Sequence, residues 1–247
     1  MKGVFYAVLL NLVSQITDVL YCIFTLTLFP FKNCFVKLLS SISLFILMLA
    51  GSSEIFAQKM LEQSFYDKDI KALYIKSDEI FEIHLSTSQN DHITIGTRID
   101  GETFESSILK TRVDNNTLKI ETGRTPDFEP FNDKLSAHKV LSIVLYISLP
   151  EGLDLDIFST LASVDAQGHF GQVQLNLGRG GCRLVNFRFR ESATINTLSG
   201  AIHVEVDSAE VHAQSRNGNV VIPAGFSEGY PLVLKSIHGD IIVTKSL

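Results

Sequence analysis

The stretch Ala193-Thr-Ile-Asn-Thr-Leu-Ser-Gly-Ala-Ile-His-Val204 places apolar residues at alternate positions on both sides of a glycine. Such alternation indicates half-buried β-strands, so the stretch predicts two strands joined at a corner. The same pattern recurs in four other segments, at residues 155–166, 173–184, 211–222 and 232–243. The position of the corner glycine is filled in turn by Ala162, Gly180, Gly200, Gly218 and Gly239.

A strand–corner–strand unit that recurs about every 20 residues is typical of a β-solenoid. One unit cannot bury its apolar side chains alone, so neighbouring units stack about 4.8 Å apart. The predicted fold is therefore all-β: a single-stranded β-solenoid (β-helix) with about five C-terminal coils and a β-rich N-terminal portion. The alternative is a meander or sandwich of regular hairpins, because a strand–turn–strand unit is also a hairpin.

The sequence predicts two features of the corner, one for its glycine and one for a nearby hydroxyl group. We expect the recurring glycine to adopt positive φ, which glycine reaches at the lowest cost, with Asn217-Gly218 as the strongest turn signal. Ser or Thr stands three residues before the glycine in three of the segments, and its hydroxyl is expected to hydrogen-bond the corner backbone. These hydroxyl residues are Thr197, Ser215 and Ser236.

Alternating runs and turn residues also fill the chain from Lys71 to Pro150, as in Phe81–Leu85 and Val140–Ile147. This pattern predicts further strands upstream of the repeats. The expected organisation is a leader at 1–57, an N-terminal β portion at 58–152 and β-solenoid repeats at 153–247.

The leader has the features of an export signal. Lys32 and Lys37 precede the apolar run Leu38–Ala50, and a small residue, Ala57, stands at the expected cleavage site. The apolar run is shorter than the roughly 20 residues that a spanning helix needs. We therefore expect a secretory signal peptide cleaved after Ala57. The alternative is an uncleaved membrane anchor at 35–57.

Residues 3–31 form a second apolar segment that is interrupted by Asp18, a costly residue at the centre of a spanning helix. The segment is either a first spanning helix or a stretch translated from upstream of the true start, which does not belong to the protein. We favour upstream translation, because a signal peptide that follows another apolar segment is unusual.

Composition narrows the classes of function. The 247 residues carry a formal net charge of −6, so a general binder of nucleic-acid phosphates is excluded. With 45% hydrophobic residues the chain is not a disordered one. Two of the three cysteines lie in the leader, which leaves Cys182 without a partner for a disulfide. We expect Cys182 to be a buried apolar residue.

The repeat h-x-h-x-[ST]-x-x-G-x-h-x-h, where h is hydrophobic, resembles the DUF4097 and GIN-domain (DUF2807) group over residues 70–247, most clearly over 153–243. This resemblance implies a secreted or envelope-associated bacterial β-helical protein of the adhesin type, and it transfers no catalytic residue. The leader is similar to those of exported Bacteroidetes proteins. A lipoprotein anchor is not expected, because no cysteine follows the cleavage site.

The residues that could carry chemistry form no catalytic or cofactor motif, so neither catalytic residues nor a cofactor is predicted. None of the seven histidines has the spacing of a metal-binding motif, although His203 and His212 would bind a transition metal if stacking aligned them. Asp154 and Asp156 share one strand face about 7 Å apart, as paired carboxylates do in glycoside cleavage, and Glu205 and Asp207 make a similar pair. Solvated strand faces explain both carboxylate pairs more simply.

Two surface features are candidates for contact with a partner. Four arginines concentrate positive charge in one repeat of an acidic protein, where they would meet an anionic glycan or a partner's carboxylates. They are Arg179, Arg183, Arg188 and Arg190. The simpler expectation is that they pair with outward Asp and Glu residues of adjacent coils. The irregular stretch 123–137 contains Phe128 and Phe131, and we interpret it as a cap over the end of the solenoid rather than an aromatic contact site.

The sequence favours an exported bacterial protein in the periplasm, on the outer surface or at the membrane, with a non-enzymatic, adhesin-like binding role. The expected partners are a surface glycan or an envelope protein, with no nucleic acid and with membrane contact only through an uncleaved 1–57. The alternatives are a polysaccharide-acting enzyme on the same scaffold and a membrane-linked structural or signalling module.

Overall fold

The computed structural model describes residues 58–66, 69–101, 107–124 and 141–246, which belong to one compact unit, Phe56–Leu247. The predicted leader lies outside the described residues. Within them, no helix has the length and apolar content required to cross a membrane. The described elements are all strands, so the prediction of an all-β chain is confirmed for this part of the protein.

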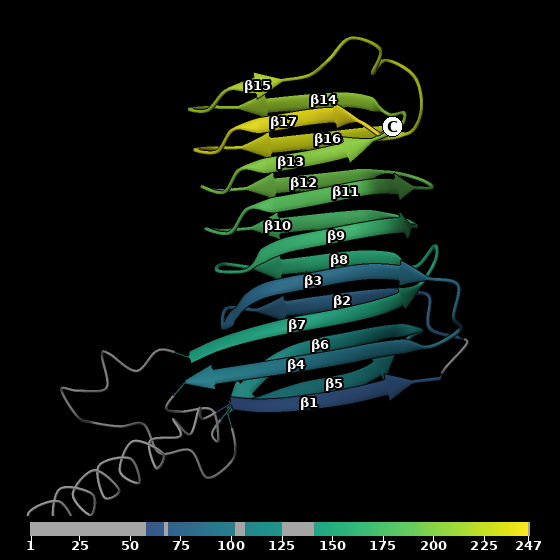
Figure 1. Cartoon of the computed structure of the whole chain (residues 1–247), viewed down its shortest axis with the longest axis vertical. Helices are drawn as coiled ribbons and strands as arrows, with labels where there is room; N and C mark the ends of the chain where they lie inside the picture. The colour runs from purple at the N-terminus through teal and green to yellow at the C-terminus, as the bar shows by residue number, and fades with distance from the viewer. Residues whose placement is uncertain (1–57, 67–68, 102–106, 125–140, 247) are drawn as a thin grey trace, which may run out of the picture. The chain divides into compact units, whose positions relative to one another are not determined.

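The strands form two sheets (Figure 1). The nine-stranded sheet has the order β1-β4-β7-β3-β9-β11-β13-β17-β15, and the eight-stranded sheet has the order β14-β16-β12-β10-β8-β2-β6-β5. Most neighbours are parallel, and the antiparallel pairs are β1/β4, β4/β7 and β5/β6. The strands are β1 Gln58–Phe65, β2 Ala72–Ser77, β3 Ile80–Ser88, β4 Ile93–Gly101, β5 Ser107–Asp114, β6 Thr117–Arg124, β7 Leu141–Pro150, β8 Asp154–Ser159, β9 Ser163–Phe170, β10 Val173–Leu177, β11 Cys182–Phe189, β12 Ala193–Thr197, β13 Ile202–Val206, β14 Glu210–Ser215, β15 Val220–Val221, β16 Pro231–Ser236 and β17 Ile241–Lys245.

Equivalent residues of the repeat segments lie side by side. In the eight-stranded sheet, Leu155 is level with Val173, which is level with Ala193, and this row continues to Leu232 and Val211. The inward side chains of both sheets form one hydrophobic cluster. The segments therefore stack in layers, as a β-solenoid-like fold requires and as a meander or sandwich of hairpins does not.

The spatial order of the layers differs from the order of the chain. The last pair of strands, β16 and β17, lies between β12–β13 and β14–β15, so the segment 210–222 ends the stack. The inward Leu232 and Leu234 of β16 are fully buried, whereas the smaller Val211 and Ala213 of β14 are only partly buried. The larger apolar side chains thus occupy the layer that is covered on both sides, where burial stabilises most.

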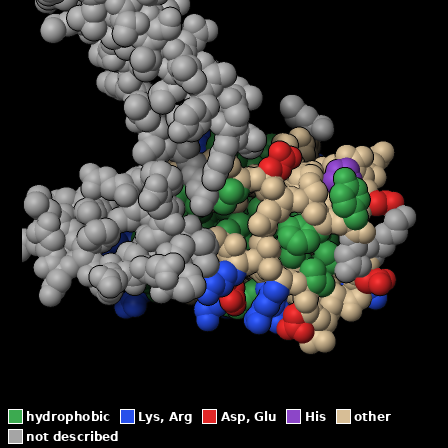
Figure 2. All heavy atoms as spheres, turned by 90° about the horizontal axis from the view of Figure 1, so that it is seen from below, with side chains coloured by type: hydrophobic (Ala, Val, Ile, Leu, Met, Phe, Trp, Pro, Cys, Tyr) green, Lys and Arg blue, Asp and Glu red, His purple; other side chains and the backbone are tan. Residues whose placement is uncertain are grey.

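The opposite end of the stack is formed by β1 and β5 (Figure 1). Figure 2 views this end and shows hydrophobic side chains exposed among polar ones. The exposed large hydrophobic residues of these two strands are Met60 and Leu61 of β1 and Val113 of β5. The antiparallel pairs of the fold lie in this half, next to the parallel stack.

The corner glycines are explained by a close approach between layers. A Cβ atom on Gly200 would lie 2.0 Å from the carbonyl oxygen of Gly180, and a Cβ atom on Gly239 would lie 2.0 Å from that of Gly200. The prediction of positive φ is wrong at these corners and at Asn217-Gly218, because the described glycines with positive φ are others: Gly152, Gly168, Gly225 and Gly229. Glycine is required because the neighbouring backbone occupies the place of a side chain.

The predicted hydroxyl contacts at the corners are confirmed. The Thr197 hydroxyl donates to the carbonyl oxygen of Gly200 at 2.7 Å. The Gly218 and Gly239 amides donate to Ser215 Oγ at 3.0 Å and to Ser236 Oγ at 2.8 Å. Each hydroxyl bonds a backbone group that the strand ladders leave free, which stabilises the turn between the sheets.

Gly200→Ala is expected to lower the free energy of unfolding by at least about 2 kcal/mol, because the added methyl group collides with backbone that cannot move aside. Gly96→Ala is the matched control in β4, since its Cβ atom would lie in ordinary contact, 3.6 Å from Tyr146 Cβ. We expect that variant to change the stability by less than about 0.5 kcal/mol. Urea denaturation followed by circular dichroism measures both, and equal losses would refute the close-approach explanation.

Candidate functional site

The outer face of the nine-stranded sheet carries a row of polar and aromatic side chains at right angles to the strands. The register places Tyr146 beside His84, His84 beside Asp165, Asp165 beside Arg183 and Arg183 beside His203. These five residues, here called the polar row, come from β7, β3, β9, β11 and β13. Outward residues at the same strand level must align, because adjacent strands are about 4.8 Å apart and in register.

The Tyr146 end of the polar row is fixed by several contacts. The rings of His84 and Tyr146 stack with their centroids 5.0 Å apart and their planes 10° apart. His84 Nε2 lies 3.2 Å from Glu82 Oε2. Arg98 Nη1 donates to the Tyr146 hydroxyl at 3.3 Å, and Arg98 Nε donates to Asp100 at 3.1 Å. Both aromatic side chains are thus held in place while remaining partly exposed.

Two shallow depressions follow the polar row. The larger has a volume of about 840 Å³ and lies around Tyr146 and His84, between β1 and Asp165 of β9. The smaller, of about 300 Å³, lies around Asp165, Arg183 and His203. The floor of the smaller depression contains small residues at one end of the strands, namely Ser163, Gly181 and Ala201.

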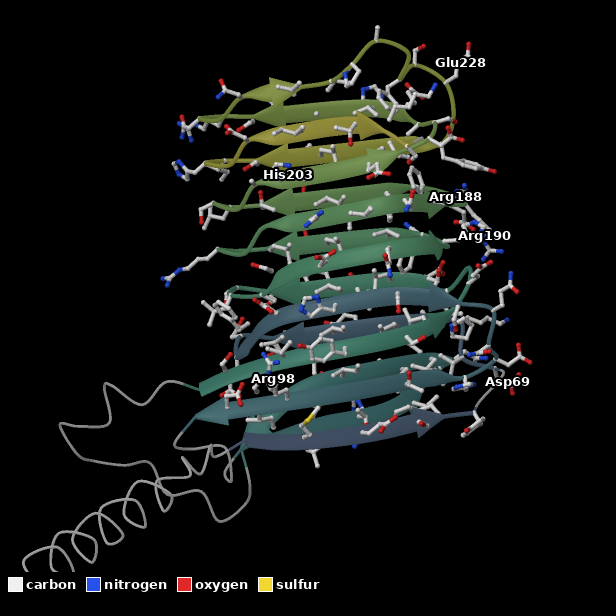
Figure 3. The ribbon with its side chains drawn as sticks, in the orientation of Figure 1. Asp69, Arg98, Arg188, Arg190, His203 and Glu228 are labelled. Carbon is white, nitrogen blue, oxygen red and sulfur yellow. The ribbon has the colours of Figure 1, made fainter. Side chains whose placement is uncertain are left out.

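The four predicted arginines are all exposed and occupy different places. Arg183 belongs to the polar row, near the start of β11, whereas Arg179 lies at the corner between β10 and β11. Arg188 and Arg190 lie at the other end of β11 (Figure 3). Arg183 and Arg188 are five residues apart, about 16 Å along the strand, so the structure brings only Arg188 and Arg190 close together.

The surroundings of these arginines differ from the expected pairing with acidic residues. The Arg190 guanidinium donates to the carbonyl oxygen of Gly152. Among the described residues, the ion pairs within 4.0 Å involve other cationic groups: His84, Arg98, Lys119 and His212. A role of Arg179, Arg183, Arg188 and Arg190 in binding a partner stays a prediction.

The two carboxylates proposed as a catalytic pair have different environments. Asp154 accepts a hydrogen bond from the Gln172 amide at 2.8 Å. Asp156 is less exposed, and its Oδ1 is buried without a hydrogen-bond partner. Burial raises the pKa of Asp156 above its ordinary value. Asp154 therefore bonds the backbone of the next layer, and the partial burial of Asp156 disfavours its charged form.

The two histidines proposed to align do not. His203 lies on β13 of the nine-stranded sheet and His212 on β14 of the eight-stranded sheet. Within the described ranges, no group of three or more metal-ligating side chains is present. The aromatic stretch at 123–137 lies outside the described residues from 125 onward.

Cys182 is buried, with 3% of its surface exposed, as the alternation predicted. Burial raises the pKa of the Cys182 thiol far above its usual value, and the negative charge of Asp165 raises it further. Thiolate is the reactive form of cysteine, so this side chain is suited to packing and not to nucleophilic chemistry.

Cys182 should therefore resist alkylation by iodoacetamide in the folded protein and react readily in concentrated urea. Mass spectrometry of the peptide that contains Cys182 measures the extent of modification separately from the other two cysteines. Rapid alkylation in native buffer would refute the buried, unionised thiol.

Asp156→Asn should stabilise the protein near neutral pH. The folded-state pKa of Asp156 is raised above the ordinary value of 3.8, so the folded protein binds more protons than the unfolded chain between the two pKa values. The contribution of Asp156 to stability therefore falls as the pH rises through that range. Thermal unfolding should show a gain for the variant at neutral pH that shrinks below pH 3.8; a variant less stable than wild type at neutral pH would contradict this.

Comparison with known proteins identifies the fold and no family. No family model matches the chain, and no curated protein matches it in sequence. A "putative cell adhesion protein" from Clostridium sporogenes shares 13% identity with a TM-score of 0.56, over 76% of this chain and 100% of that one. A "putative adhesin" from Bacteroides fragilis shares 10% identity over 76% and 97% of the two chains, with a TM-score of only 0.28. The similarity to the first of these structures supports the all-β, layered fold of this chain.

Proposed function

We propose that this protein is an exported bacterial cell-envelope β-solenoid, of the DUF4097 and GIN-domain type, that binds a surface polymer without chemically altering it. The coils of the solenoid are the five repeat segments, and residues 1–57 direct export. The binding surface is the outer face of the nine-stranded sheet, and the expected partner is a surface glycan or an envelope protein.

The observation that carries this proposal is the polar row. Its five side chains come from five neighbouring strands and lie in line on an open face. A ligand with repeating groups meets such a row at successive strands, whereas a small substrate gains little from it because it cannot be enclosed. The similarity to a structure named as a cell adhesion protein supports the same role.

Catalysis on a β-helix scaffold is the alternative, and the environment of Asp154 and Asp156 does not favour it. General acid–base cleavage of a glycosidic bond requires two carboxyl groups directed at one bond. Asp154 is engaged with the backbone, and one carboxylate oxygen of the partly exposed Asp156, Oδ1, is buried. We therefore favour binding over turnover.

The test is binding of the full chain to a panel of immobilised bacterial and mucin polysaccharides by surface plasmon resonance. The pair Arg183→Ala and His203→Ala should weaken binding at least about tenfold, because each removes a polar contact worth roughly 1 kcal/mol or more. Variants on the opposite sheet, Lys235→Ala and Gln214→Ala, are the matched control and should bind as wild type does.

Chromatography of the polysaccharide after long incubation with the protein tests the non-enzymatic role. An unchanged chain length is expected, and shortened chains would support the enzyme instead. Equal losses for both sets of variants, or no binding to any polymer on the panel, would contradict the proposed face.

A further inference from the structure

The larger depression contains a slot where β4 carries Gly96. The register places Gly96 between Glu62 of β1 and Tyr146 of β7. Because Gly96 has no side chain, Glu62 and Tyr146 face each other across two strand spacings, about 9.6 Å between their backbones. This separation leaves room for one flat ring beside the tyrosine.

The tyrosine side of the slot is rigid before any ligand arrives. His84, on the far side of β7 from β4, stacks on one face of the Tyr146 ring. The opposite ring face is turned toward β4, where Gly96 contributes no side chain beside it. Arg98 holds the tyrosine hydroxyl and is itself held by Asp100. A pre-oriented side chain loses little entropy on binding, so this arrangement suits a specific contact.

The charges that line the slot select the ligand. Glu62 is the carboxylate beside the slot, and Asp165 lies elsewhere in the same depression, beyond His84. Arg98, which borders the slot at the tyrosine hydroxyl, is paired with Asp100. The face of an aromatic ring attracts cations, and a carboxylate opposite the ring adds a charge-assisted hydrogen bond. Glu62 and the ring face therefore favour a cationic group over an anionic one at this place.

The slot also offers hydrogen bonds beside the ring. Ser148, Thr94, Ser86 and Gln167 line the same depression. Hydroxyl and amide groups donate and accept, so they match the hydroxyl groups of a sugar. A lysine side chain would use the carboxylates and the ring face but would leave these polar groups without ligand partners.

We propose that this slot binds an amino-sugar residue of a cationic glycan. The sugar ring lies on the open face of Tyr146, its ammonium group pairs with Glu62, and its hydroxyl groups bond to the neighbouring polar side chains. This inference rests on the proposed binding function and specifies the ligand class of the same face.

The experiment is isothermal titration calorimetry of the full chain with the glucosamine tetramer in mildly acidic buffer, where the sugar amines are protonated. The N-acetylated tetramer has the same rings without the charge, and we expect it to bind at least about tenfold more weakly, in keeping with the loss of a charge-assisted contact. A lysine tetrapeptide supplies ammonium groups without sugar rings and should also bind at least about tenfold more weakly.

Two variants test the geometry. Glu62→Gln removes the counter-charge, and Gly96→Leu fills the slot at a position where a Cβ atom is accommodated. Each should weaken glucosamine-tetramer binding at least about tenfold. Glu205→Gln on β13 is the matched control on the same face and should bind as wild type does.

Equal binding of the acetylated tetramer, tighter binding of the lysine peptide, or wild-type binding by both slot variants would overturn the inference. Binding to panel polysaccharides without binding of the glucosamine tetramer would overturn this inference alone and leave the proposed function standing. Failure on the whole panel would instead count against the function itself.

Discussion

The close approach of backbone to backbone at the corners is the constraint on which the stack depends. At Gly180, Gly200 and Gly239 the carbonyl oxygen of the adjacent layer occupies the space that a Cβ atom would need. Only at this distance do the strands on both sides of the corner keep their hydrogen bonds to the next layer. The hydroxyls of Thr197, Ser215 and Ser236 then satisfy the backbone groups that the turn leaves unpaired.

This tight stacking determines what the outside of the protein can present. When layers repeat in register, inward residues form apolar columns and outward residues form rows across the strands. The polar row is such a row, and the stacked rings of His84 and Tyr146 are a direct result of the spacing between β3 and β7. A face built in this way is rigid, because each side chain is held by a strand with neighbours on both sides.

Much of this architecture could be predicted from the repeat, because its pattern is local. The alignment of the segments that begin near Leu155, Val173, Ala193, Val211 and Leu232 is the same alignment in which their strands pair. The role of the corner glycine was predicted wrongly, since spacing marks where glycine is required but does not distinguish positive φ from close contact. The arginine-rich repeat suggested one patch, yet Arg183 and Arg188 face different ends of the strand.

The sequence by itself therefore determined the strands, their inward faces and the positions of the corners, because alternation and turn residues act over a few neighbours. Only the tertiary structure decided which layers are adjacent, as in the insertion of β16 and β17 before the end of the stack. It also decided which outward residues share a row, as Glu62, Gly96 and Tyr146 do. These choices depend on contacts between segments far apart in the chain, where burial and packing select the partner and no local pattern encodes it.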